Sequence, residues 1–199
     1  MMAVTRKRTK HLVAAAAVLT GGLALGLASA ALALRISGSW AAVRNGPWRA
    51  FLEAGSPEAD LYTRAAIAVG GLLALDKSET IYFVASEDDD GHALRARCDY
   101  RVEGRDPAAR WWSLTLYGAD RFLIANPQQR FSYSGTTLRR EADGGYVVHV
   151  SATAKPGNWL PSGNETQLFL TLRLYNPAAS LYAAPARAAL PRIVAERCP

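Results

Sequence analysis

Aromatic side chains and a few polar ones that could form a ligand-binding patch are concentrated in the second half of this 199-residue chain. Tyr175 and the indoles of Trp111 and Trp159 could stack on sugar rings, and Asn158 and Arg173 could supply hydrogen bonds. The same aromatic side chains could instead belong to the core, because each one buries a large apolar area. We therefore predict a patch that receives a protein, a glycan or another extended ligand, with core packing as the alternative.

The sequence contains no recognisable catalytic motif. There is no Gly-x-Ser-x-Gly elbow, no His-Glu-x-x-His zinc motif and no phosphate-binding glycine loop. His149 stands alone in a predicted strand, where a histidine is more often structural than a general base. Asp120, Glu141 and Glu165 border predicted loops, and two of them could be the paired carboxylates of a hydrolase or lyase acting on an envelope polysaccharide. We predict a binding protein without a catalytic residue or a cofactor, and keep that enzyme as the alternative.

The acidic run from Glu87 to Gly91 could bind calcium, because hard cations take clustered carboxylates. Its carboxylates do not alternate with spacer residues as they do in a calcium loop, and Arg95, Arg97 and Arg101 nearby could balance their charge. The run therefore predicts a solvated hairpin turn and no metal site.

The stretch from Gln167 to Tyr175 has the clearest strand pattern in the chain. Its alternate positions are occupied by Leu168, Leu170, Leu172 and Leu174. Because successive side chains of a strand point to opposite faces, burial of the leucines places Arg173 on the other face. There Arg173 could belong to the binding patch, or it could form an ion pair with a carboxylate such as Glu165 or Asp99.

Shorter runs with the same two-residue period precede this strand and are separated by Gly and Pro. The predicted strands are Glu79–Ser86, Arg97–Gly104, Trp111–Gly118 and Phe131–Ser134, followed by a hairpin of Thr137–Glu141 and Gly145–Ala154 around Asp143-Gly144. Seven or eight short strands predict a mainly β fold, an antiparallel β-sandwich or jelly roll.

A single amphipathic helix is predicted before the sheet, from Ser56 to Leu75. Ser56 can cap it, Pro57 suits the first helical position, and Glu58 and Asp60 lie in the first turn, where the helix dipole favours acidic groups.

Residues 12–34 contain no charged side chain, and a helix of this length spans a hydrocarbon core of about 30 Å. The basic flank within residues 1–11 should stay cytoplasmic. We predict a transmembrane helix held in the lipid bilayer of a bacterial inner membrane, with a periplasmic C-terminal domain. A cleaved signal peptide is the alternative, because Ala28-Ser29-Ala30 could be a cleavage site.

The small residues Gly22, Gly26 and Ala30 recur at four-residue spacing in this segment, which would let a second helix approach closely. A homo-oligomer formed through this helix face is a further expectation, and chance spacing is its alternative.

Residues 35–56 are predicted to be a juxtamembrane linker and residues 57–199 the β-sandwich domain. Trp40 suits the membrane interface, whereas Trp48 is expected to pack on the domain. Four of the positive charges belong to the basic flank, so without them the net charge falls from +6 to +2. A remainder so close to neutral argues against a nucleic-acid partner.

Cys98 and Cys198 both follow the export signal, and an exported pair of cysteines favours a disulfide. Only one intramolecular pairing exists, and the pair lacks the close Cys and His spacing of a zinc site.

Several stretches together resemble the bacterial family called domain of unknown function 1214. They are Asp60–Ala65, Ser78–Phe83, Trp111–Tyr117, Asn158–Pro161 and Leu172–Pro177. The resemblance covers roughly Asp60 to Cys198 and implies jelly-roll architecture. In longer relatives a second domain precedes this one, and here a membrane segment stands in that place. No activity is implied by the resemblance.

Overall fold

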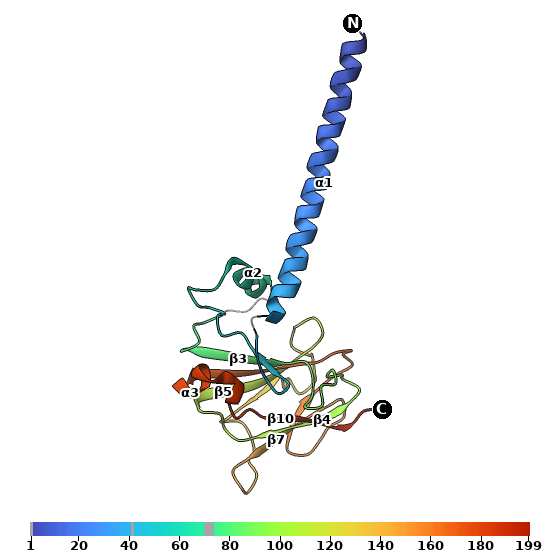
Figure 1. Ribbon diagram of the computed structural model, residues 1–199. Helices are drawn as coiled ribbons and strands as arrows, with labels where there is room; N and C mark the ends of the chain where they lie inside the picture. Colours follow the sequence, from blue (N-terminus) through green and yellow to red (C-terminus); the bar gives the residue numbers. More distant parts are fainter. Residues whose placement is uncertain (1, 41, 70–73) are drawn as a thin grey trace. The chain divides into compact units, whose positions relative to one another are not determined.

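The computed structural model describes residues 2–40, 42–69 and 74–199, and its contacts divide the chain into two compact units (Figure 1). One unit contains residues 2–40 and 60–69, and the other contains residues 42–59 and 74–199. Side chains of the first helix are described from residue 10 to residue 34, so the predicted interfacial position of Trp40 lies outside the described side chains.

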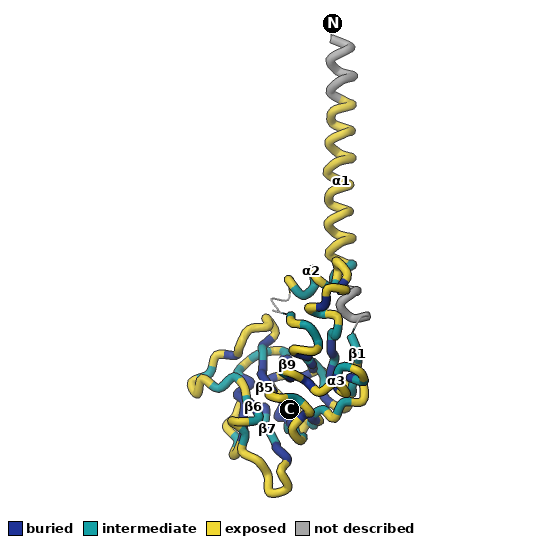
Figure 2. The backbone as a smooth tube through the Cα atoms, turned by 90° about the vertical axis from the view of Figure 1, so that its left-hand side faces the viewer, coloured by how far each residue is buried: buried dark blue, intermediate teal, exposed yellow. Residues whose placement is uncertain are grey.

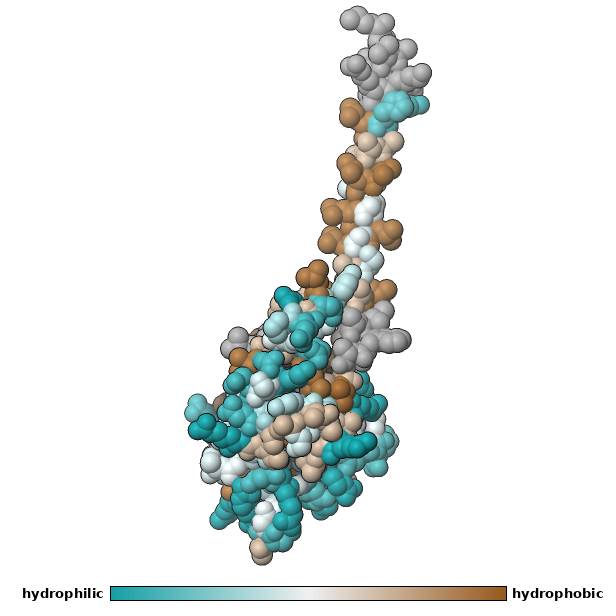
Figure 3. Space-filling view, turned by 60° about the vertical axis from the view of Figure 1, so that its left-hand side comes forward, coloured by the Kyte–Doolittle hydropathy of each residue, from teal (hydrophilic) through white to brown (hydrophobic). Residues whose placement is uncertain are grey.

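Helix α1 (Met2–Trp40) contains the predicted membrane segment. Its stretch Lys10–Leu34 has 25 residues with a mean hydropathy of 2.0, which is long and apolar enough to cross a membrane. The stretch is exposed over most of its length, and apolar side chains cover much of it (Figures 2 and 3). An anchor and a signal sequence share these properties.

Helix α2 (Leu61–Val69) is shorter than the predicted helix and begins later. Asp60 caps it, since one carboxylate oxygen of Asp60 accepts the backbone N–H groups of Tyr62 and Thr63 at 2.8 and 3.1 Å. The hydroxyl and N–H of Thr63 lower the pKa of Asp60. The prediction that Ser56 caps the helix is wrong, because the Ser56 hydroxyl accepts the N–H of Glu58 in a separate turn.

In the described part of the chain ten strands form two sheets, which confirms the mainly β class. The six-stranded sheet has the order β1 (Val43–Asn45), β2 (Trp48–Ala50), β3 (Thr80–Ala85), β9 (Phe169–Pro177), β5 (Ala109–Tyr117) and β6 (Ser132–Ser134). The four-stranded sheet has the order β10 (Arg192–Arg197), β4 (Asp99–Gly104), β7 (Tyr146–Ser151) and β8 (Asn158–Pro161). Neighbours are antiparallel except for β7 and β8, which are parallel. A short helix α3 (Ala179–Ala183) and the 3-10 turn η1 (Pro185–Arg187) precede β10.

The core consists of the inner faces of the two sheets. All four leucines of the predicted leucine face are buried, at 0 or 1 % exposure, so this prediction is confirmed. In register with Leu172 lie Phe83 on β3 and Leu114 on β5, both fully buried. The rings of Trp112 and Tyr146 stack across the core at 5.1 Å, joining the two sheets.

Two predictions about local pairing need correction or extension. The predicted hairpin around Asp143-Gly144 is a turn, but β7 pairs with β4 and β8 and not with residues 137–141. That segment is held by a side chain instead, because the amide of Asn158 bonds both the N–H and the C=O of Arg139. Within the predicted linker, β1 and β2 join the six-stranded sheet through β3. Trp48 is buried there as expected, and its indole N–H donates to the carbonyl of Pro191 at 2.7 Å.

The predicted disulfide is confirmed. Cys98 and Cys198 are bonded, with their Cα atoms 4.2 Å apart and a sequence separation of 100. The bond ties the C-terminal strand β10 to the start of β4, its neighbour in the sheet.

Candidate functional site

The outer face of the six-stranded sheet carries the predicted Arg173. On the central strand β9, Arg173 lies in register between Tyr82 of β3 and Ser113 of β5. Because the leucines of β9 fill the core, Arg173 and its register neighbours are directed to the opposite face. The prediction that Arg173 lies opposite the leucines is therefore confirmed.

Neutral groups surround the guanidinium of Arg173. Its Nη1 donates to the hydroxyl of Thr115 at 3.0 Å, and its Nη2 donates to the phenol oxygen of Tyr117 at 2.6 Å. The guanidinium carbon lies 5.5 Å from the ring centroid of Tyr117 and 5.9 Å from that of Tyr82, within cation–π range. Arg173 is thus a half-buried cation that is surrounded by the phenols of Tyr82 and Tyr117 and the hydroxyl of Thr115.

Neither carboxylate that was considered as an ion-pair partner fills that role. Asp99 lies on the other sheet, where it pairs with Lys155 at 2.8 Å. Glu165 accepts a weak hydrogen bond from the N–H of Ala119 at 3.5 Å. Among the residues that the structure describes, no carboxylate forms an ion pair with Arg173, so the alternative of a structural ion pair is wrong.

Tyr175 and Trp111 continue this face on one side of Arg173. They lie opposite each other in register, and their ring centroids are 5.2 Å apart at an angle of 60°. Trp111 is 41 % exposed, which is unusual for a tryptophan in a sheet and makes its ring accessible to a partner. Beneath them, the buried hydroxyl of Thr80 has no hydrogen-bond partner in the described part of the chain.

A cation lies near one end of the face. Beyond Tyr117, the guanidinium of Arg121 lies 3.7 Å from the ring centroid of Phe169, and Phe169 is in register with Tyr117. Beside Trp111, a hollow of about 210 Å³ is also lined by Trp112 and the exposed Arg110. Both alternate with Trp111 along β5 and therefore belong to the other side of the sheet. This hollow is also lined by Asp106, Thr136 and Arg140.

We name the whole surface the arginine–aromatic stripe. Its members are Arg121, Phe169, Tyr117, Arg173, Tyr82, Tyr175 and Trp111. From Tyr117 to Trp111 it follows β5 for roughly 20 Å, at about 3.3 Å per residue. The stripe therefore offers aromatic surfaces and guanidinium groups along a line long enough for an extended ligand.

The ring of Tyr82 is half-buried, so this face is partly shielded from water. Burial raises the pKa of Tyr82, and the neighbouring Tyr175 raises it further, while the charge of Arg173 opposes both effects. The Tyr82 phenol therefore stays protonated at neutral pH and can both donate and accept hydrogen bonds.

Asn158 and Trp159, which were predicted to join Arg173 and Tyr175, lie on β8 of the other sheet. Asn158 is buried, and its amide donates to the carbonyls of Arg139 and Val147, so its hydrogen-bonding groups are used within the fold. The indole N–H of Trp159 donates to the carbonyl of Ser151 at 2.9 Å. The structure brings Arg173, Tyr175 and Trp111 together and leaves Asn158 and Trp159 apart from them.

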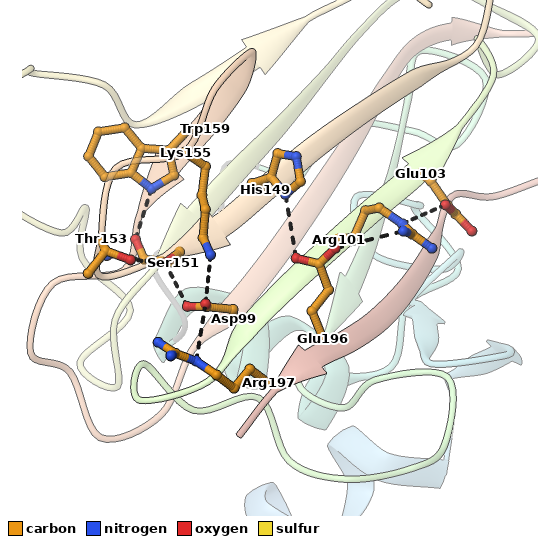
Figure 4. Close-up of polar contacts among 10 residues, drawn as sticks. All are labelled: Asp99, Arg101, Glu103, His149, Ser151, Thr153, Lys155, Trp159, Glu196 and Arg197. Carbon is orange, nitrogen blue, oxygen red and sulfur yellow. Dashed lines mark hydrogen bonds and ion pairs between the residues drawn. The ribbon is translucent and has the colours of Figure 1, made fainter. Parts of the chain in front are cut away.

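The outer face of the four-stranded sheet carries a charged network (Figure 4). Asp99, nearly buried, accepts hydrogen bonds from the hydroxyl of Ser151 at 2.6 Å and from the ammonium of Lys155 at 2.8 Å. Arg197 approaches the same carboxylate at 3.7 Å, next to the disulfide. The bonds from Lys155 and Ser151 lower the pKa of Asp99, so this network stabilises the fold through an ionised carboxylate.

Replacing Asp99 with asparagine is expected to destabilise the protein by about 2 to 3 kcal/mol at pH 7, because hydrogen bonds to a charged partner are lost. The folded-state pKa lies below the unfolded value, so the stabilisation is present above the unfolded pKa and is lost as pH falls through the folded pKa. Urea unfolding at pH 7 and at acidic pH measures both effects. Asp143→Asn, at an exposed pair with Arg105, is the control and should change stability little. An Asp99→Asn protein as stable as the parent at pH 7 would contradict the assignment.

The residues considered for catalysis are distributed over different parts of the molecule. His149 on β7 lies 3.6 Å from Glu196 of β10 within the charged network. Asp120 and Glu165 stabilise the turn after β5. The carboxylate of Asp120 accepts a hydrogen bond from the N–H of Phe122, and that of Glu165 accepts one from the N–H of Ala119. Glu141 instead lines a hollow of about 380 Å³ beside Tyr146. Burial raises the pKa of Tyr146, so its phenol is a protonated group there.

The acidic run forms a turn before β4, as predicted. The buried carboxylate of Asp88 accepts the N–H groups of Asp90 and His92 at 3.1 and 2.9 Å. Asp89 binds the guanidinium of Arg192 and the N–H of Ile193, which attaches the turn to β10. Potential metal-binding atoms of Asp88, Asp90 and His92 lie within 4.8 Å of one another. One carboxylate oxygen of Asp88 is already used in hydrogen bonds to the backbone of the turn.

Comparisons with known proteins support the fold and identify no activity. The family described as "Protein of unknown function (DUF1214)" matches residues 79–179, a range that contains the whole stripe. The chain is similar to the VPA0106 protein of Vibrio parahaemolyticus, with 25 % identity and a TM-score of 0.59 over 70 % of this chain and 36 % of that one. A weaker likeness, at 21 % identity and a TM-score of 0.42, is to an uncharacterised protein of Burkholderia cenocepacia, over 59 % of this chain and 29 % of that one. The chain thus spans about a third of the length of these structures. A comparison with curated proteins finds no match.

Proposed function

Because the chain belongs to the DUF1214 family, whose function is unknown, we propose a function from its own site: a membrane-anchored envelope protein that binds an extended, negatively charged polysaccharide along the arginine–aromatic stripe. One observation carries the proposal. Arg173 is a half-buried cation whose described partners are neutral, so its charge is available to a ligand.

The chemistry of Arg173 favours an anionic group. A guanidinium has five N–H donors in a planar fork, and the hydroxyls of Thr115 and Tyr117 each accept one hydrogen bond. Charges in shielded surroundings are usually paired, and a carboxylate or sulfate of a ligand would complete this one with charge-assisted hydrogen bonds.

The surrounding rings favour a sugar polymer over a small anion. Trp111 and Tyr175 present aromatic surfaces of the kind on which sugar rings can stack, and the phenols nearby can bond to hydroxyl groups. Arg121 places further positive charge toward one end. The nearby carboxylates Glu79 and Glu165 form hydrogen bonds with Asn176 and with the N–H of Ala119.

Binding of the full-length protein, held in detergent micelles, to immobilised polygalacturonate and to immobilised dextran tests this function. Polygalacturonate should be bound, and the binding should weaken as salt is added, because salt screens exposed charges. Equal binding to neutral dextran, or binding to neither polymer, would contradict the proposal.

The anchoring part of the proposal is that α1 is retained with its basic flank in the cytoplasm, so that the β domain is periplasmic. The apolar stretch is longer than that of an ordinary signal peptide. The intact mass of the membrane-bound protein should include residues 1–34, and protease added to spheroplasts should digest the β domain. A mature N-terminus near Ala31, or a domain protected from the protease, would refute it.

A further inference from the structure

Helix α2 exposes an apolar face. None of its nine residues is buried, and Leu61 and Val69 are each 81 % exposed. With the exposed Ala68 they recur at the seven- and eight-residue spacing of one helix face, while Thr63 and Ile67 on the other side are half-buried. A helix that only covered a soluble domain would direct its largest apolar side chains inward.

The residues that border this face are of types that are common at a membrane surface. Tyr62 is 51 % exposed on one flank, and the exposed Arg64 lies on the other. Tyrosine rings rest at headgroup depth, and an arginine can keep its charge in water while its stem lies on apolar surface. The helix contains no acidic residue that an anionic lipid surface would repel, and Asp60 lies just outside it as the cap.

The position of α2 beside α1 is also consistent with contact with a membrane surface. Helix α2 belongs to the same compact unit as α1 and lies beside the C-terminal end of α1 (Figure 1). The apolar stretch of α1 ends at Leu34, only about 9 Å of helix before α1 ends at Trp40. A bilayer spanned by α1 would therefore have its outer surface close to α2.

We propose that α2 is a membrane-surface helix, whose Leu61, Ala68 and Val69 insert into the outer interface of the bilayer that α1 spans. The inference rests on the proposed anchoring by α1 and is independent of the ligand on the stripe. Its partner is the lipid surface itself, and it gives the protein a second attachment to the membrane next to its anchor.

Quenching of a fluorescent label by spin-labelled lipids tests this inference in the full-length protein. Leu61→Cys and Val69→Cys are labelled with an environment-sensitive fluorophore after reconstitution into phosphatidylcholine and phosphatidylglycerol vesicles, with the native disulfide kept oxidised. Thr63→Cys is the control on the other face of α2, and Ala154→Cys is the control in an exposed loop of the β domain. We expect blue-shifted emission and strong quenching at residues 61 and 69, weaker quenching at residue 63, and none at residue 154.

Flotation of the same vesicles separates the two proposals. Protein that floats with the vesicles but shows no quenching at residues 61 and 69 would overturn the inference about α2 and leave the anchor intact. Protein that does not float would overturn both. Quenching replaced by cross-linking between the cysteines of two copies would identify the face as a contact between copies and would also overturn the inference.

Discussion

Replacing Arg173 with glutamine is expected to weaken binding of polygalacturonate by about 10- to 100-fold, because charge-assisted hydrogen bonds worth about 1.5 to 3 kcal/mol are lost. Glutamine keeps a polar side chain on the stripe but removes the charge and the planar fork. Arg173→Lys should recover part of the affinity, since it restores the charge without the two parallel donors. Binding isotherms of the full-length variants at low salt measure both changes.

Stability separates a binding role of Arg173 from a structural one. Its described bonds are to two hydroxyl groups on a half-buried face, so glutamine should lower the free energy of unfolding by only about 1 kcal/mol. Arg105→Gln removes the same charge at an exposed pair just after β4 and should leave both binding and stability nearly unchanged. If Arg173→Gln lowers the free energy of unfolding by several kcal/mol, as the loss of a buried pair would, then Arg173 is structural and the stripe is not the site.

The orientation of Arg173 could be predicted from the sequence because it depends on a local rule. Alternation along one strand determines which side chains share a face, and the leucines of β9 show which face is buried. The contacts of Tyr82 and Tyr117 with Arg173 were missed for a physical reason. Each tyrosine alternates with core residues in its own predicted strand, but their meeting at Arg173 depends on the register of β3 and β5 against β9, which involves residues far apart in the chain.

Asn158 and Trp159 were assigned to the patch by residue type, because an amide can form hydrogen bonds to a ligand and an indole can stack on a sugar ring. In the structure their segment is the short strand β8, parallel to β7, with Pro161 at its last position on the sheet edge. Asn158 bonds the backbone of Arg139, a contact between residues distant in sequence. The start of α2 also depends on a contact that the sequence pattern does not determine, here between residues close in sequence. Two capping residues were available, and the contact of Asp60 with Thr63 gave Asp60 this role.

Reduction of the disulfide is expected to have the largest effect on stability, about 4 to 5 kcal/mol. Joining residues separated by 100 positions removes much of the freedom of the unfolded chain, and the chain-entropy account gives this magnitude for a loop of that length. The bond also holds β10, an edge strand that contacts the rest of its sheet only through β4 among the described strands.

Urea unfolding of the oxidised protein and of the same protein with both thiols reduced and blocked measures this difference without a mutation. Cys98→Ala with Cys198→Ala should behave like the reduced protein, apart from a small loss of packing at the fully buried Cys98. Hydrogen exchange in β10 should quicken on reduction before exchange in β9 does, because β10 loses its covalent tie while β9 keeps both of its neighbours in the sheet. Equal urea midpoints for the oxidised and reduced proteins would show that the ladder between β10 and β4, together with the pair of Asp99 and Arg197, holds the chain end without the bond.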